Sequence, residues 1–443
     1  MTDVSPRRRR EVIDALRRGT VPANGLDLLA VGLDRFLPAL DIDLDTVENG
    51  GSAFKAVRGE YGAGKTFVTR YIAERALRRG FASAEVQISE TETPLHKLET
   101  VYRRIGEALR TAAFPPSAFR AVLDAWLFTI ESDVTNTDPT LLQRGPEALD
   151  EAVTTLLEQR LAAVSSRTPA FAQALRAYRS AVTVGDGARA DALGAWLGGQ
   201  RNVAASARRA AGIKGELDHF GAMGFLQGLL IVLRDSGHPG LVLVLDEVET
   251  LQRVRGDVRD KALNALRQLV DEVDSGRYPG LFLILTGTPA FYDGPSGVPR
   301  LPPLAQRLAT DFSTDARFDN PRAVQLRLPG FNHSTLLELG MTVRDLYTGA
   351  ATEPARITRL VDDAYLSQLA TAVTGSLGGR VGIAPRVFLK KLVGDVLDRV
   401  DQFADFDPRV HYKLTLAATE LSEVERNAAA LPAASVDDVE LDL

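Results

Sequence analysis

The sequence predicts an α/β fold, in which a parallel five-stranded sheet carries a helical insertion and is followed by a C-terminal helical region. Three observations support this prediction. Short, mostly apolar runs alternate with segments of helical periodicity, as in parallel sheets whose strands are joined by helices. The long stretch between the second and third runs contains helical patterns only. After Pro329 and Gly330 the pattern is helical again.

Five short runs are expected to form the sheet. Buried parallel strands are apolar on both faces, so they appear as near-continuous hydrophobic stretches of four to eight residues. In chain order the runs cover residues 53–57, 84–88, 241–245, 281–285 and 324–328.

The first 40 residues are expected to form an N-terminal helical segment. Val12, Ile13 and Leu16 give residues 11–18 one apolar face, and residues 26–40 carry a second helical pattern. Residues 1–10, with arginine at positions 7–10, are expected to be a solvated tail, because charge runs at chain ends are usually disordered. Contact of these arginines with phosphates is the alternative.

The rest of the chain divides into three parts. The core with the sheet is expected over residues 41–330, and it contains an all-helical insertion at about 115–220. A C-terminal helical domain is expected over residues 331–434, followed by a disordered acidic tail over 435–443.

Composition excludes several classes of protein. The chain has 443 residues, a formal net charge of −6 and no cysteine, so disulfides, zinc fingers and cysteine nucleophiles are ruled out. The five histidines show no metal-ligand spacing. No apolar run approaches the roughly 20 residues that cross a bilayer. A soluble, cytoplasmic protein without a membrane partner is therefore expected.

A glycine-rich loop follows the first expected strand and precedes a helix. It matches the pattern G-x-x-x-x-G-K-[ST], which cradles phosphates with backbone N–H groups at a helix N-terminus. The lysine of such a loop reaches the β- and γ-phosphates and the hydroxyl ligates Mg²⁺. ATP and Mg²⁺ are therefore the expected ligands. The residues concerned are Gly59, Glu60, Tyr61, Gly62, Ala63, Gly64, Lys65 and Thr66, with Phe67 next in the helix.

Two acids directly follow the third expected strand. Asp246 and Glu247 would lie at the carboxyl edge of the sheet, where parallel sheets bind ligands. Asp246 is expected to hold Mg²⁺, and Glu247 to orient or deprotonate the water that attacks ATP. The alternative is that both acids cap the next helix. The phosphate-binding loop favours the first interpretation.

The order of these elements resembles that of the AAA+ ATPases, nearest to the origin-recognition initiators. A narrower resemblance is to the BrxD-type ATP-binding proteins of bacterial BREX phage-exclusion systems, a P-loop family of unknown function. It spans about residues 10–430. The residues that carry it are the loop with Phe67, the segments 18–22 and 243–249, and Ala384, Pro385 and Arg386.

The resemblance implies an AAA+-type P-loop NTPase fold, in which the C-terminal helices form a lid over the nucleotide. It also implies an ATPase in anti-phage defence that works with other BREX proteins and forms a homo-oligomer. DNA is a candidate partner. However, only about 40 residues follow the helix that is expected to end near Val400, which is short for a winged-helix domain and argues against autonomous duplex binding.

The resemblance also implies further site residues. Thr286 is the first candidate for a polar side chain that contacts the γ-phosphate or water; Thr288 is the second, and an ordinary turn is the alternative. Arg386 is expected to contact the γ-phosphate from the lid. Val21 and Pro22 are expected to pack on the purine. Arg307 is the candidate arginine finger for a neighbouring subunit. Its competitors are Arg300, Arg317 and Arg322.

Three functions remain open from the sequence. The first is an oligomeric ATPase motor or loader acting on DNA or on a DNA-bound complex. The second is a slow ATPase that acts as a nucleotide-dependent assembly switch. The third is a regulatory ATPase that senses a ligand through the helical insertion.

Overall fold

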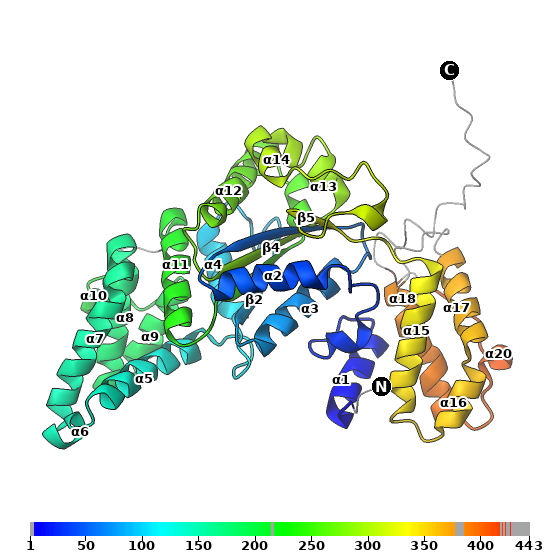
Figure 1. Cartoon of the computed structure of the whole chain (residues 1–443), viewed down its shortest axis with the longest axis horizontal. Helices are drawn as coiled ribbons and strands as arrows, with labels where there is room; N and C mark the ends of the chain where they lie inside the picture. The colour runs from blue at the N-terminus through cyan, green and yellow to red at the C-terminus, as the bar shows by residue number, and fades with distance from the viewer. Residues whose placement is uncertain are drawn as a thin grey trace.

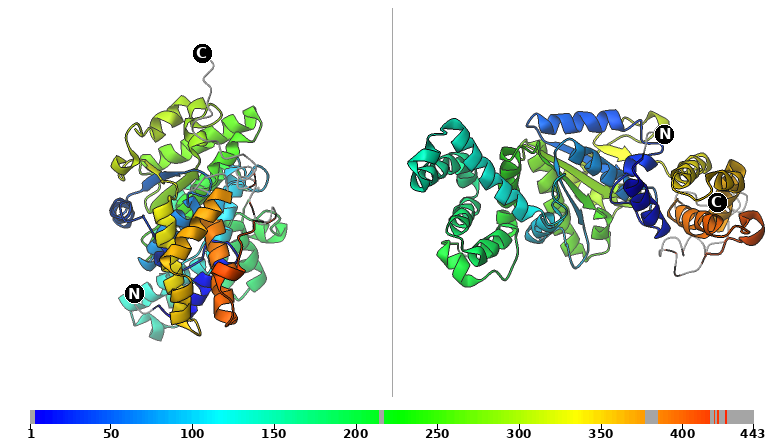
Figure 2. Two further views of the ribbon diagram at one scale, coloured as in Figure 1. Left: turned by 90° about the vertical axis from the view of Figure 1, so that its right-hand side faces the viewer. Right: turned by 90° about the horizontal axis from the view of Figure 1, so that it is seen from below.

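The sheet lies in the middle of an elongated molecule (Figure 1). The computed structural model describes residues 4–213, 217–376 and 385–416, together with residues 419, 421 and 426. The helices of the insertion extend from one side of the sheet, and the C-terminal helices lie beyond its other side, as two further views confirm (Figure 2).

All five predicted strands are present, and all their pairings are parallel, in the order β2-β3-β4-β1-β5. The prediction of a parallel five-stranded sheet is therefore confirmed. The strands are β1 (Ala53–Arg58), β2 (Ala82–Gln87), β3 (Leu241–Asp246), β4 (Leu281–Gly287) and β5 (Gln325–Arg327).

Alternate side chains of the central strands enter two different cores, because successive residues of a strand point to opposite faces. Leu241, Leu243 and Leu245 belong to one cluster with α4 (Leu98–Ala108), α11 (His219–Asp235) and α12 (Gly256–Asp274). The intervening Val242 and Val244 pack with α2 (Leu37–Glu48) and α3 (Lys65–Arg78) on the other face. Helices therefore cover both faces of the sheet.

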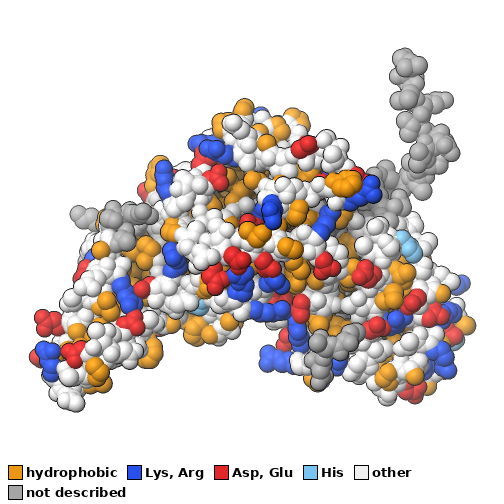
Figure 3. Space-filling view, viewed as in Figure 1, with side chains coloured by type: hydrophobic (Ala, Val, Ile, Leu, Met, Phe, Trp, Pro, Cys, Tyr) orange, Lys and Arg blue, Asp and Glu red, His pale blue; other side chains and the backbone are white. Residues whose placement is uncertain are grey.

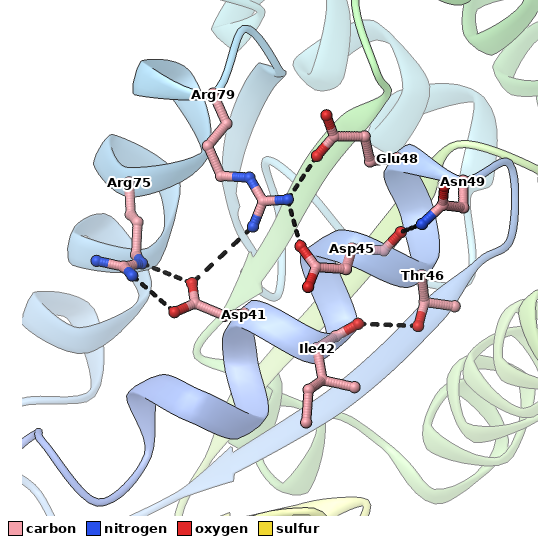
Figure 4. Close-up of polar contacts among 8 residues, drawn as sticks. All are labelled: Asp41, Ile42, Asp45, Thr46, Glu48, Asn49, Arg75 and Arg79. Atoms are coloured by element: carbon pink, nitrogen blue, oxygen red, sulfur yellow. Dashed lines mark hydrogen bonds and ion pairs between the residues drawn. The ribbon is translucent and has the colours of Figure 1, made fainter.

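Helix α2 is joined to α3 by a row of ion pairs (Figure 4). Asp41, Asp45 and Glu48 lie on one side of α2, since residues three and four apart are neighbours on a helix. Asp41 accepts two hydrogen bonds from Arg75, at 2.7 and 2.6 Å, and Arg79 donates to both Asp45 and Glu48. These contacts position the helix whose N-terminus carries the glycine-rich loop.

The insertion shares one core with the sheet. Phe171 and Trp196 pack edge-on against Phe225 of α11, with ring centroids 5.0 and 5.1 Å apart, and Trp126 donates a hydrogen bond to Asp235. The insertion helices are α5 (Phe119–Thr137), α6 (Leu141–Arg144), α7 (Pro146–Arg167), α8 (Pro169–Thr183), α9 (Gly187–Leu197) and α10 (Ala205–Ala210). The described part of the predicted insertion contains no strand.

The N-terminal helix packs on the C-terminal helices. Val12, Ile13 and Leu16 of α1 (Pro6–Arg17) belong to the same hydrophobic cluster as the C-terminal residues. Arg17 donates two hydrogen bonds to Asp398. The C-terminal elements are α15 (His333–Thr348), α16 (Pro354–Leu360), α17 (Asp363–Ser376), α18 (Pro385–Lys390), a π-helix (Lys391–Leu397), α19 (Asp398–Gln402) and α20 (Pro408–His411).

The solvated tail predicted for residues 1–10 is wrong for residues 6–10, which form the first turns of α1. The Ser5 side chain accepts a hydrogen bond from the Arg8 backbone, and Pro6 occupies the first turn, where its missing N–H is tolerated. Arg8 forms an ion pair with Asp27, and Arg9 donates to the carbonyl of Gly349 at 2.8 Å. These arginines therefore have partners within the chain.

The helical pattern predicted for residues 26–40 is interrupted. These residues form a 3₁₀ turn (Leu26–Leu29) and the start of α2, and Gly32 between them has a left-handed φ of +74°. In the C-terminal helical region α16 and α17 are separate helices, because the Asp362 side chain accepts a hydrogen bond from the backbone N–H of Tyr365 and caps a new helix. The predicted acidic tail, residues 435–443, lies outside the described residues.

Candidate nucleotide-binding site

The glycine-rich loop joins β1 to α3. Gly62 and Gly64 have φ values of +81° and +89°, a left-handed conformation that favours glycine, and Gly64 directly precedes α3. The first N–H groups of a helix have no partner within that helix. The loop therefore presents donors, and the positive end of the helix dipole, at the carboxyl edge of the sheet.

Lys65, the first residue of α3, is directed back toward the loop. Its Nζ donates to the carbonyl oxygens of Gly59 at 2.9 Å and Glu60 at 3.4 Å. It also lies 5.1 Å from the centre of the Tyr61 ring, within the range of a cation–π contact. The side chain is 8% exposed.

Asp246, the last residue of β3, connects the glycine-rich loop to the neighbouring strand β4. Its Oδ2 accepts a hydrogen bond from the Thr66 hydroxyl at 3.0 Å. Its Oδ1 accepts from the Thr286 hydroxyl at the end of β4 and from the Glu247 backbone N–H. Thr286 is fully buried, and its Oγ1 also accepts a hydrogen bond from that N–H, at 3.0 Å. The structure thus brings Thr66, Asp246, Glu247 and Thr286 together, whereas Thr288 is the residue that precedes α13 (Pro289–Asp293).

Glu247 has a left-handed backbone conformation, with φ at +59°, which is uncommon for residues other than glycine. Its carboxylate accepts a hydrogen bond of 2.9 Å from Gln87 at the end of β2. Gln87 was not predicted as a site residue. Its position in the sheet identifies Gln87 as a site residue, because it pairs in register with Asp246 across the parallel strands β2 and β3.

A second buried acid, Glu249, faces the same region. It lies in the 3₁₀ turn Val248–Gln252, is 4% exposed and has its Oε1 3.7 Å from the Lys65 Nζ. Burial raises the pKa of Glu249; the Lys65 ammonium opposes this shift, and the Glu247 and Asp246 carboxylates add to it. No role was predicted for this residue.

These groups surround a cavity of about 380 Å³. Its walls come from the N-terminal segment, the loop, the end of β3, the segment after β5 and α18. Of the residues predicted for the site, the lining includes Val21, Pro22, Tyr61, Gly62, Ala63, Gly64, Lys65, Thr66, Phe67, Asp246, Glu247 and Arg386. Gly59 and Glu60 form the entry of the loop, and Thr286 lies behind Asp246.

Phe331, which was not predicted as a site residue, also lines the cavity. Its ring lies 3.7 Å from the position that a side chain at Gly64 would take. Phe331 follows β5 at the start of the C-terminal helices, so only the folded chain shows that it meets the loop.

Arg307 lies away from this cavity. It belongs to α14 (Pro302–Leu308), is half exposed and forms an ion pair of 2.8 Å with Asp271 of α12. Of its competitors, Arg300 pairs with Asp260 and Arg317 with Asp315. A residue that acts on a neighbouring subunit would lie outside its own cavity, so this position leaves the prediction for Arg307 untested.

The oxygen atoms of Thr66 and Asp246 suit a magnesium ion. Mg²⁺ is usually held by one or two protein oxygens together with phosphate oxygens and water. The Thr66 hydroxyl and the Asp246 carboxylate are 3.0 Å apart at the mouth of the loop. Among the described residues, no group of three or more His, Cys, Asp or Glu side chains could hold a metal by itself.

The parallel sheet, the glycine-rich loop and the acids after β3 are consistent with a P-loop NTPase, a class of nucleotide-binding protein. The family model of the BREX system ATP-binding protein BrxC/D matches residues 4–416. The chain therefore belongs to this family. A search of curated proteins finds no match. No helix in the described part of the chain is long and apolar enough to span a membrane.

Proposed function

We propose that the chain binds ATP with Mg²⁺ and hydrolyses it in a bacterial anti-phage BREX system. One observation carries the proposal. Lys65, Thr66, Asp246 and Glu247 converge on one cavity at the carboxyl ends of β1 and β3, although they come from sequence segments about 180 residues apart. This is the edge at which parallel sheets bind ligands.

The proposed roles follow from position. The loop N–H groups and Lys65 bind the phosphates, and Thr66 and Asp246 hold Mg²⁺, which neutralises charge that develops on the phosphates. Glu247 orients or deprotonates water, and Thr286 supports it through the Glu247 N–H and Asp246. Val21 and Pro22 offer apolar surface to the purine, and Arg386 faces the cavity from α18.

The proposal extends to the AAA+ type. Residues 331–434 would then act as the lid, and the N-terminal segment 1–40 would complete the nucleotide pocket. Support comes from the cavity, whose wall includes Arg386 and Leu389 of α18 and Gly19 to Pro22 of the N-terminal segment. Arg307, exposed on α14, would act on the nucleotide of a neighbouring subunit in a homo-oligomer.

The nucleotide site is tested with two variants. Lys65→Ala removes the ammonium and is expected to abolish ATP binding, measured by isothermal titration calorimetry. Glu247→Gln is expected to bind ATP as wild type does. Its rate of ATP hydrolysis is expected to fall by about 10²–10⁴-fold, the usual contribution of a general base. ATP binding by Lys65→Ala with wild-type affinity would contradict the site.

Two candidate functions remain for the process that ATP hydrolysis would drive. An oligomeric motor or loader acting on DNA, or on DNA-bound defence proteins, predicts that DNA stimulates ATP hydrolysis. A nucleotide-dependent assembly switch or regulatory ATPase predicts no stimulation by single- or double-stranded DNA. Acidic and basic side chains are intermixed over the middle of the face shown in Figure 3, which favours neither outcome. Gel filtration with and without ATP tests the oligomer.

A further inference from the structure

Glu249 is a buried acid for which the proposed hydrolysis has no use. It lines the cavity beside the loop, yet it is 4% exposed. Within the described residues, neither of its carboxylate oxygens accepts a hydrogen bond from another residue. A buried carboxylate to which no other residue donates is costly, so its position needs a compensating charge.

The compensating charge is the Lys65 ammonium, 3.7 Å from Glu249 Oε1. An ammonium group has three protons to donate. Two of the Lys65 contacts are with the carbonyl oxygens of Gly59 and Glu60, and the Tyr61 ring covers a further side. Glu249 therefore lies beside a lysine that is itself almost fully buried and that already donates to two carbonyl oxygens.

We propose that Glu249 is a positioning residue that competes with nucleotide phosphates for Lys65 and so limits the affinity for nucleotide. The inference rests on the proposed function, ATP binding at this loop. A phosphate oxygen and the Glu249 carboxylate are both anionic acceptors for the same ammonium. When a phosphate binds the Lys65 ammonium, the Glu249 carboxylate stays buried without its compensating charge, and it also repels the phosphate.

Replacing the carboxylate with an uncharged group of the same shape should therefore strengthen binding. Glu249→Gln is expected to bind ATP and ADP about three- to tenfold more tightly than wild type, because one buried negative charge near the phosphates is removed. Damage to the fold would act in the opposite direction and weaken binding. The sign of the change thus separates the proposed role from a merely structural one.

The test is calorimetric titration of ATP and ADP into the full-length protein. Glu90→Gln is the matched control, since it removes one exposed carboxylate from the loop after β2. The control should bind as wild type does, because water and salt screen an exposed charge. Affinity of Glu249→Gln equal to wild type, or weaker, overturns the inference even if Lys65→Ala has lost ATP binding. If wild type itself binds no ATP, the proposed function and the inference both fall.

A crystal structure of the wild-type protein with a non-hydrolysable ATP analogue gives a second measurement. The Lys65 Nζ should then contact a phosphate oxygen, and its distance from Glu249 should be longer than the present 3.7 Å. A Lys65–Glu249 pair that persists unchanged beside bound phosphate would also overturn the inference.

Discussion

Glu247 is held at both ends, through its backbone and through its carboxylate. Its left-handed backbone is fixed by the N–H contacts with Asp246 and Thr286, and its carboxylate accepts the hydrogen bond from Gln87. This hydrogen bond is exposed to solvent, so its net contribution is about 0.5–1.5 kcal/mol. The contact with Gln87 therefore opposes any rotation of the carboxylate toward water in the cavity.

Gln87→Ala tests this restraint. The variant is expected to raise the basal ATPase rate severalfold. The reason is that the Glu247 carboxylate, the proposed base, loses its hydrogen bond to Gln87, while the Glu247 backbone keeps its contacts. Steady-state hydrolysis at saturating ATP measures the effect. Gln227→Ala is the control: it removes an amide hydrogen bond to the Arg277 carbonyl, and Gln227 is not among the residues that line the cavity. An unchanged or lower rate for Gln87→Ala would show that Gln87 does not restrain Glu247.

At the scale of elements, α1 belongs with the C-terminal helices, far from it in sequence. Asp398 accepts hydrogen bonds from Arg17 at 2.6 and 2.9 Å and from the Tyr347 hydroxyl at 2.8 Å. The Asp398 side chain is 12% exposed and so has little access to water. Asp398, the first residue of α19, thus connects α1 to α15 through hydrogen bonds.

Asp398→Ala is expected to lower the free energy of unfolding by about 1–3 kcal/mol, since it leaves the Tyr347 hydroxyl and part of the Arg17 guanidinium without an acceptor. Urea unfolding followed by circular dichroism measures the change. The control is Glu11→Ala, which removes the ion pair between Glu11 and Arg7. Because this pair is largely exposed, the free energy of unfolding should not change measurably. An equal effect of both substitutions would show that the buried contacts add nothing.

The strands were predictable because both of their faces are buried. In β3 every residue from Leu241 to Asp246 is buried, and such a run is visible in the sequence without knowledge of its neighbours. The phosphate-binding loop was predictable for a related reason: left-handed backbone at Gly62 and Gly64 requires a specific residue type. Both signals are local.

The features that were missed depend on contacts between distant segments. In the sequence, the arginines at positions 7–10 are typical of a solvated tail. In the folded chain, Asp27 pairs with Arg8, and the Gly349 carbonyl accepts a hydrogen bond from Arg9. Gln87 and Glu249 are ordinary polar residues until the sheet places one beside Glu247 and the other beside Lys65. Neither pairing follows from periodicity or composition, because the partners are separated by more than a hundred residues.

At the scale of the whole molecule, the cavity joins three parts of the chain. The N-terminal segment, the sheet with its loop, and the C-terminal helices each contribute wall residues, represented by Val21, Lys65 and Arg386. A ligand that contacts all three would stabilise their arrangement, by about 2.7 kcal/mol at a concentration one hundred times its Kd.

Hydrogen–deuterium exchange tests this joint closure. ATP with Mg²⁺ is expected to slow exchange in the loop, in the N-terminal segment around residues 19–33 and in α18, because the ligand disfavours their local opening. Helices α7 and α8 of the insertion do not line the cavity and should exchange at an unchanged rate. Protection limited to the loop would mean that the C-terminal helices do not close on the nucleotide.

The strand order has a consequence for the biosynthesis of the protein. Among the described residues, strand β1 pairs only with β4 and β5, so Ala53 meets Phe282 and Ala56 meets Gln325. Both edges of β1 thus remain without their partner strands while the ribosome makes the next two hundred residues or more. The insertion helices, whose contacts are closer in sequence, can fold during that interval. The strand that leads into the phosphate-binding loop is therefore among the last to enter the sheet.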